Sequence, residues 1–202
     1  MTTDGERSQP DDSLPSVYLI RHGETAWSLS RQHTGHTDIP LTERGERDAR
    51  GLSARLQSMS FVCVLSSPLS RARRTAELAG FADRIATDDD LMEWDYGAYE
   101  GLKTSEIRAK QPGWNPFTDG CPGGETVADV GVRADRVIAR VRALRGNSIL
   151  FAHRDILRVL AARWIALPAL EGRRLYLETA SVSVLGYDHD ANEPVIRGLN
   201  DA

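Results

Sequence analysis

The chain has 202 residues, enough for about one compact domain. Hydrophobic residues make up 41% of it and charged residues 27%, fractions that are typical of globular proteins. They argue against a disordered, collagen-like or membrane-spanning chain. Every apolar run is far shorter than the roughly 20 residues that cross a bilayer, so we expect no membrane partner.

The charge is spread unevenly along the chain. The formal net charge is −4, and residues 1–12 contribute three of these negative units. The rest is almost neutral, which argues against a nucleic-acid partner because nucleic-acid binders carry strongly basic surfaces. Two cysteines without framework spacing favour a reducing, cytoplasmic location. Residues 1–15 lack the features of a signal peptide and predict a disordered leader before a single domain over 16–202.

Strand and helix patterns alternate along the chain. Helices are predicted from Thr42 to about Leu56 and over about 69–79, 126–144 and 156–165, with Thr42 as an N-cap. Short apolar runs predict four strands, at 17–20, 61–65, 148–152 and 182–185. This alternation predicts an α/β fold with a mostly parallel central sheet and helices on both faces. The segment 108–125, rich in Pro and Gly, predicts a loop over the site.

Reactive side chains follow three of the predicted strands. Arg21 and His22 follow the first, Arg71 lies shortly after the second, and His153 follows the third. Ligands of open α/β sheets bind beyond the carboxyl ends of the strands, so we expect these groups to converge. A metal held by the histidines, with Glu93, Glu24, His33 or His36 completing the set, would face repulsion from the guanidiniums. Arginine instead matches phosphate oxygens, which favours a phosphoryl ligand.

His22 is the candidate nucleophile of this cluster. The adjacent Arg21 disfavours imidazolium and leaves a neutral ring whose free nitrogen can attack phosphorus. The leaving alkoxide then needs a proton, for which a carboxyl group among apolar neighbours is suited. Glu93 and Asp95 both satisfy this requirement, and their spacing alone does not separate them.

Six motifs in order resemble the histidine phosphatase superfamily, the phosphoglycerate mutase-like proteins. They are L-I-R-H-G-E-T at 19–25, T-G-H-T-D-I-P-L-T-E-R-G at 34–45, S-S-P-L-S-R-A-R-R-T-A at 66–76, E-W-D-Y-G-A-Y-E-G at 93–101, G-G-E-T at 123–126, and His153. The resemblance implies that His22 is phosphorylated and that Arg21, Arg71 and His153 hold the phosphoryl oxygens. It also implies that Glu93 is the proton donor and that no metal or other cofactor takes part.

Departures from the family pattern bear on the reaction. Mutases of the family carry Asn where this chain has Ser28 and Arg where it has Gln32, together with an inserted Arg pair that is absent from this sequence. The pattern at 27–38 is more similar to sugar-phosphate and broad-specificity acid phosphatases, including sedoheptulose-bisphosphatase-like proteins. We therefore expect a phosphatase that acts on small phosphomonoesters, with a phosphoglycerate mutase as the alternative.

A second departure is Arg154, where the family has glycine after its histidine. Three interpretations remain open: Arg154 adds a cation to the pocket, it turns away to pair with Asp155 or Glu125, or it obstructs the site. The last would leave a catalytically impaired phosphate-binding protein.

Further residues are candidates for substrate contact. We expect Thr34 and Gly35 to offer backbone donors to phosphate, and Tyr96 either to pack or to form a wall of the pocket. The substrate-binding candidates are Ser28, Thr34, Gly35, Tyr96 and Arg154. The expected partner is a small-molecule phosphate ester, and the sequence is compatible with a homodimer.

Overall fold

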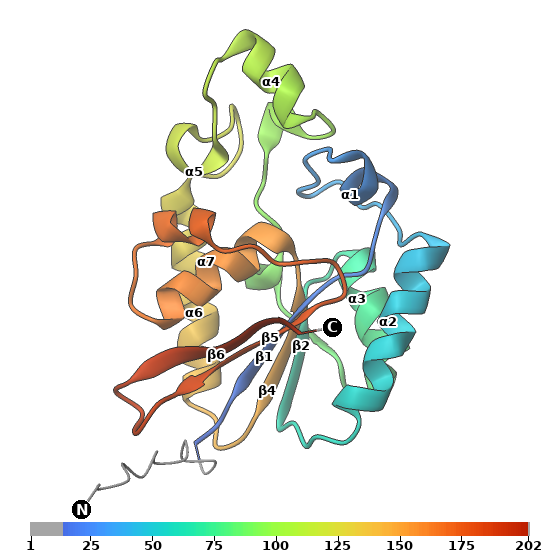
Figure 1. Cartoon of the computed structure of the whole chain (residues 1–202), viewed down its shortest axis with the longest axis vertical. Coiled ribbons are helices and arrows are strands. Elements are labelled where there is room, and N and C mark those ends of the chain that lie inside the picture. Colours follow the sequence, from blue (N-terminus) through green and yellow to red (C-terminus); the bar gives the residue numbers. More distant parts are fainter. Residues whose placement is uncertain (1–13, 202) are drawn as a thin grey trace, which may run out of the picture.

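The computed structural model describes residues 14–201, and its centre is a six-stranded sheet (Figure 1). The strands are β1 (Val17–Arg21), β2 (Cys63–Ser66), β3 (Ala86–Thr87), β4 (Ser148–Ala152), β5 (Val182–Tyr187) and β6 (Pro194–Asp201). Their order is β3-β2-β4-β1-β5-β6. The pairs β1–β4, β2–β4 and β2–β3 are parallel, whereas β5 pairs antiparallel with both β1 and β6. The predicted α/β fold with a mostly parallel sheet is confirmed.

Helices cover both faces of the sheet. On one face lie α2 (Glu43–Leu56) and α3 (Ser70–Ala76), and on the other lie α6 (Val127–Arg142) and α7 (Arg154–Trp164) (Figure 1). Shorter helices stand beyond the carboxyl ends of the parallel strands: α1 (Ala26–Ser30), α4 (Thr104–Lys110) and α5 (Pro116–Asp119). None of the described helices is long and apolar enough to cross a membrane.

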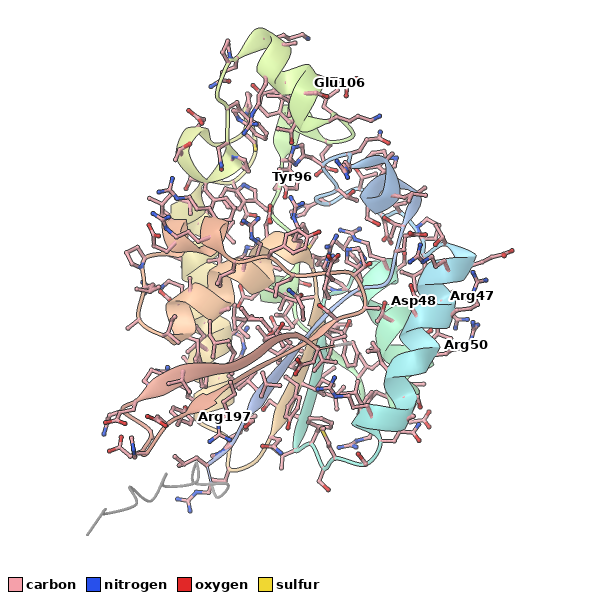
Figure 2. All side chains as sticks on the ribbon, viewed as in Figure 1. Arg47, Asp48, Arg50, Tyr96, Glu106 and Arg197 are labelled. Carbon is pink, nitrogen blue, oxygen red and sulfur yellow. The ribbon has the colours of Figure 1, made fainter. Side chains whose placement is uncertain are left out.

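The sheet separates two hydrophobic cores. Alternate residues of β1 point to opposite faces, so that Leu19 packs under α6 and α7 while Ile20 packs under α2. The outward face of α2 carries Arg47, Asp48 and Arg50 (Figure 2), which is the charged side of an amphipathic helix. The parallel strands are packed between the two cores. This packing fixes the positions of the residues at their carboxyl ends.

The sequence predicts the long elements better than the short ones. The helices expected after Thr42 and over 126–144 are present, and the side chains of Thr42 and Thr126 cap them. The segment 108–125, expected to be a loop over the site, instead contains the end of α4 and all of α5. It buries Trp114 and Phe117, and none of its residues lines the cavity described below. The leader predicted over 1–15 falls largely outside the described residues.

Candidate active site

His22 follows β1 and lines a cavity of about 470 Å³ beyond the carboxyl ends of the strands. The ring atom Nδ1 lies 2.7 Å from the Gly23 carbonyl oxygen. Since a carbonyl only accepts, Nδ1 carries the proton and Nε2 keeps its lone pair. Nε2 has no hydrogen-bond partner among residues 14–201. Burial, and then the Arg71 and Arg21 guanidiniums, hold the pKa of His22 well below its ordinary value. The ring is therefore neutral, and burial outweighs the neighbouring arginine.

His153 lies beside His22 because β4 runs parallel to β1. The register pairs Arg21 with Ala152, the residue before His153, and the two imidazole centroids are 5.1 Å apart. Arg71 Nε donates to His153 Nδ1 at 3.1 Å, and His153 Nε2 in turn donates to Ser67 Oγ at 2.8 Å. Burial and Arg71 hold the pKa of His153 well below its ordinary value. Both histidines of the cluster are uncharged.

Arg71 is fully buried behind the two histidines. Besides its bond to His153, its Nη1 donates to the Thr37 carbonyl at 3.0 Å and its Nη2 to the Gly35 carbonyl at 2.8 Å. The carbonyls of Thr34 and Gly35 accept from Arg71. The expectation that the N–H groups of these two residues donate to phosphate stays a prediction. Thr34 lines the cavity, whereas Gly35 does not. The turn at 34–37 holds the arginine in place.

Arg21 lines the cavity and is the least satisfied cation near His22. Its Nη1 donates to the Leu177 carbonyl at 2.7 Å, but its buried Nε has no partner within residues 14–201. No carboxylate in the described part of the chain forms an ion pair with it. Burial and the nearby Arg154 lower the pKa of Arg21 to about 10. A buried N–H donor without a partner, beside a neutral imidazole, is suited to an anionic ligand.

Glu93 lines the same cavity from a different part of the chain. Backbone N–H groups of Asp155 and Ile156, in the first turn of α7, donate to its carboxyl group at 3.1 and 3.0 Å, and that of Trp94 at 3.0 Å. Burial, and then the charge of Asp155, raise the pKa of Glu93. Asp95, the other candidate acid, lies outside the cavity and accepts from the Gly97 N–H. The geometry therefore places Glu93, and not Asp95, at the site.

The comparisons with known proteins agree with this geometry. The family model described as histidine phosphatase superfamily (branch 1) matches residues 17–202. The chain belongs to the histidine phosphatase superfamily. It is 40% identical to an acid phosphatase of Mycobacterium tuberculosis, with 91% of this chain and 92% of that protein covered. It is 38% identical to sedoheptulose 1,7-bisphosphatase of Saccharomyces cerevisiae, with 76% and 68% covered.

Two further similarities extend this relationship. A probable phosphoglycerate mutase of Salmonella choleraesuis is 35% identical, with 85% of this chain and 84% of that protein covered. The solved structure of an open reading frame from Mycobacterium tuberculosis superposes with a TM-score of 0.86 at 36% identity and covers 92% of this chain and 97% of that one. This histidine phosphatase is an enzyme of the phosphatase type.

The departure at Arg154 combines two of the three interpretations. In this histidine phosphatase Arg154 lines the cavity, and its Nε also donates to Asp155 Oδ1 at 3.0 Å. Arg158 and Tyr96 donate to the same carboxylate at 2.7 and 2.5 Å. Burial alone would raise the pKa of Asp155, but Arg154 and Arg158 hold it well below its ordinary value. Glu125, the other expected partner, pairs with Arg133 instead.

Some of the remaining candidate residues line the cavity, and some contact other parts of the chain that surround it. Tyr96 does both: it lines the cavity, and its ring packs 4.7 Å from that of His33 (Figure 2 shows Tyr96 between α4 and the sheet). The sequence names His33 and His36 as possible metal ligands; His33 lines the cavity, whereas His36 does not. Ser28 lines the cavity too, but its hydroxyl donates to the Thr25 carbonyl and accepts from the Thr25 N–H. Its main contact is thus the N-terminus of α1.

Gly23 packs tightly against the start of α2. A Cβ atom at Gly23 would lie 2.5 Å from the carbonyl oxygen of Gly45, and one at Gly45 would lie 2.2 Å from that of Glu24. Two motif glycines therefore let the first turn of α2 pack against the chain around His22.

Proposed function

We propose that this enzyme hydrolyses small phosphomonoesters, sugar phosphates among them, through a phosphohistidine intermediate on His22 and without a metal. The observation that carries the proposal is the unpartnered, buried Nε of Arg21 beside the neutral ring of His22 at an open cavity. A cationic donor and a free nucleophilic nitrogen together fit an anionic, electrophilic phosphoryl group. Relatives named acid phosphatase and sedoheptulose 1,7-bisphosphatase support the choice of hydrolysis and of sugar phosphates.

The proposed reaction has two displacements at phosphorus. The lone pair of His22 Nε2 forms a bond to phosphorus while the ester P–O bond breaks, and the leaving oxygen takes its electron pair. Glu93 protonates that oxygen. A water molecule then attacks the phosphohistidine, Glu93 takes its proton, and the P–N bond breaks to release phosphate and restore Nε2.

The carboxyl group of Glu93 has one oxygen suited to carry the proton. Oε1 accepts from the Trp94 and Ile156 N–H groups at 3.0 Å each, and Oε2 accepts only from the shared Asp155 N–H at 3.1 Å. A protonated carboxyl group therefore holds its hydrogen on Oε2. The raised pKa of Glu93 favours this protonated form relative to an ordinary glutamate.

Three further groups would stabilise the charge of the phosphoryl group. Arg21 lines the cavity, and its guanidinium holds a buried Nε without a partner among residues 14–201. Arg71 and His153 lie fully buried near His22, where Arg71 adds positive charge to the surroundings of the transferred group and the uncharged His153 adds a polar ring held by Arg71. Preorganised donors of this kind lower the barrier because they need no rearrangement as charge develops.

Replacing His22 tests the proposal. We expect His22→Ala to lower the turnover of p-nitrophenyl phosphate by about 10⁴-fold or more. Wild-type protein quenched during turnover should carry phosphate that is labile in acid and stable in base. His189→Ala, an exposed histidine on the turn between β5 and β6, is the matched control. Full activity of His22→Ala, or a strict requirement for a divalent metal after chelation, would contradict the mechanism.

A phosphoglycerate mutase is the second candidate, since one relative carries that name. A mutase has to retain its intermediate with cations on the second anionic group. Here the side chain of Gln32 donates to the Gly101 carbonyl at 2.7 Å, and the Ser28 hydroxyl is engaged at α1. Interconversion of 3- and 2-phosphoglycerate, measured with and without a bisphosphoglycerate primer, separates the two activities.

An impaired phosphate-binding protein is the third candidate, because Arg154 lines the cavity. The cavity reaches His22 with Arg154 in place, and the bond to Asp155 holds this arginine at its wall. This arrangement favours an active enzyme. Binding of inorganic phosphate without hydrolysis of p-nitrophenyl phosphate from about pH 4 to about pH 8, with activity gained in Arg154→Gly, would favour the impaired protein instead.

A further inference from the structure

The backbone that carries Glu93 has little regular structure of its own. A 3₁₀ turn at Asp89–Leu91 ends before it, and another at Gly97–Tyr99 begins after it. The hydrogen bonds that a helix or strand would supply must therefore come from elsewhere. Two side chains remote in sequence supply many of them, Arg133 on α6 and Glu125 just before that helix.

Arg133 uses all of its five N–H donors on this segment and on Glu125. Its Nη1 donates to the carbonyls of Asp90 and Met92, at 2.8 Å each, and its Nη2 to the carbonyl of Glu93 at 3.4 Å. Nε and Nη2 also donate to the two carboxylate oxygens of Glu125, both at 2.7 Å. The guanidinium thus fixes the backbone up to the proton donor.

Glu125 fixes the backbone on the other side of Glu93. Its Oε2 accepts from the Asp95 N–H at 3.0 Å, and its own N–H donates to the Asp95 carbonyl at 2.9 Å. Its carbonyl accepts from the indole of Trp94 at 3.0 Å. Arg133 and Glu125 together therefore hold the chain immediately before and after Glu93.

Neither residue of the pair can touch the substrate where it stands. The side chains of Arg133 and Glu125 are 13% and 20% exposed, and neither lines the cavity. The two hydrogen bonds of the bidentate pair lie in the plane of the guanidinium, and this planar geometry fixes the orientation of Arg133 relative to Glu125. Any effect of this pair on the reaction must pass through the position of Glu93.

We infer that the Arg133–Glu125 pair is a positioning device for the proton donor, which sets where the Glu93 carboxyl group stands relative to the leaving oxygen. This inference rests on the proposed role of Glu93. Proton donation tolerates little displacement, because the acid has to lie within hydrogen-bond reach of the oxygen that it protonates.

The leaving group of the substrate separates positioning from a merely structural role. p-Nitrophenolate is stable as an anion and needs no proton to depart, whereas the alkoxide of glycerol 3-phosphate does. A displaced Glu93 should therefore lower kcat/KM for the alkyl ester and spare kcat/KM for the aryl ester, since this parameter covers the steps up to departure of the leaving group and not the later hydrolysis of the phosphohistidine. A variant that merely unfolds part of the enzyme should slow both equally.

The experiment compares Arg133→Met with Arg163→Met as the matched control. Arg163 also forms a bidentate pair, with Asp135 at 2.8 and 3.0 Å, but on the surface between α6 and α7. We expect Arg133→Met to lower kcat/KM for glycerol 3-phosphate by about 10- to 100-fold and for p-nitrophenyl phosphate by less than about 3-fold. The control should change neither. Equal losses on both esters in folded Arg133→Met would overturn the inference.

Two more variants keep the test decisive. If Arg133→Met does not fold, Glu125→Gln retains the shape of the pair and should show the same selective loss to a smaller extent. Glu93→Gln should lose the alkyl ester selectively, and adding Arg133→Met to it should cost nothing further. If Glu93→Gln loses the alkyl ester selectively and neither Arg133→Met nor Glu125→Gln does, the positioning role is refuted and the proton-donor role of Glu93 stands. No selective loss in Glu93→Gln refutes the proposed donor, and the positioning role with it.

Discussion

The cavity has two walls that are built in different ways. The first wall is formed by Arg21 and His22, with the buried His153 packed beside His22. Each of these residues ends or directly follows a parallel strand, and the pairing of β1 with β4 sets their spacing. In the second wall Glu93 lies in irregular backbone, held by N–H groups of α7 and by side chains before and on α6. The sheet itself thus positions one wall, and hydrogen bonds between distant segments position the other.

This difference predicts a division of labour. Under the proposed mechanism the strand-end wall handles the phosphoryl group, which every substrate shares. In the first displacement, which kcat/KM reports, the Glu93 wall supplies a proton that only esters with poor leaving groups need. Changes in the first wall should therefore affect all substrates alike, and changes in the second should depend on the leaving group.

Among the changes that compare the two walls, the largest effect is expected at Arg71. Arg71→Lys keeps the charge but cannot bond His153 and the carbonyls of Thr37 and Gly35 together, because lysine lacks the planar fork. We expect kcat/KM to fall by about 10³-fold for p-nitrophenyl phosphate and for glycerol 3-phosphate alike. Steady-state kinetics with the two esters checks this. A loss confined to the alkyl ester would break the division between the walls.

The next effect concerns the turn that holds Arg71. A Cβ atom at Gly35 would lie 2.4 Å from the backbone oxygen of Trp94 and 2.0 Å from a carboxylate oxygen of Glu100. Gly35→Ala should therefore lower the free energy of unfolding by about 1–3 kcal/mol, because backbone has to move. It should also slow both esters alike.

Urea denaturation measures the change in stability, with Gly51→Ala as the control. Gly51 lies in α2 with open space around its Cα, so alanine should raise the free energy of unfolding by about 0.5–1 kcal/mol. Equal stability of the two variants would show that the 34–37 turn adapts, and that it does not fix Arg71.

The two walls also differ in how well the sequence predicts them. The strand-end wall follows from apolar runs that end in reactive residues, together with the rule that ligands of α/β sheets lie beyond the strand ends. The pairing that brings His22 beside His153 needs no information beyond two parallel neighbouring strands. The roles of these residues stay predictions, but their proximity is confirmed.

The second wall could not be predicted in the same way. Periodicity left Glu93 and Asp95 equivalent, and contacts over 30 or more residues, with the start of α7 and with Arg133, separate them. Nothing in the local pattern of residues 93–95 signals those contacts. The short helices α4 and α5 were missed for a related reason: tertiary packing of Trp114 and Phe117 orders a segment whose Pro and Gly content predicts a loop.

A charge change tests the electrostatics of the second wall. Asp155→Asn removes the negative charge that raises the pKa of Glu93 and leaves Arg154 and Arg158 to favour the carboxylate. The pKa of Glu93 should therefore fall, and its protonated form should be lost at a lower pH. We expect the alkaline limb of the kcat/KM profile for glycerol 3-phosphate to move to lower pH. The acid limb, set by His22 in the first wall, should stay in place.

The profile for p-nitrophenyl phosphate is the internal control for this variant. Its alkaline limb should change little, because the aryl leaving group does not draw on Glu93. Asparagine still offers an oxygen to the Tyr96 hydroxyl, so the packing of the wall is largely kept. Parallel shifts for both esters would mean that Asp155 acts on the first wall as well.

The smallest effect is expected for Thr126→Ala, which tests whether α6 as a whole, or Arg133 alone, positions the second wall. Thr126 caps α6 through a bond from the Asp129 N–H, and Thr126→Ala should lower the free energy of unfolding by about 1 kcal/mol. Glu125 and Arg133 keep their own bonds to the chain around Glu93, so the ratio of alkyl to aryl activity should stay unchanged. Thermal unfolding and the two-ester assay measure both quantities. A changed ratio would assign the positioning to the start of the helix, because the cap touches neither the substrate nor Glu93.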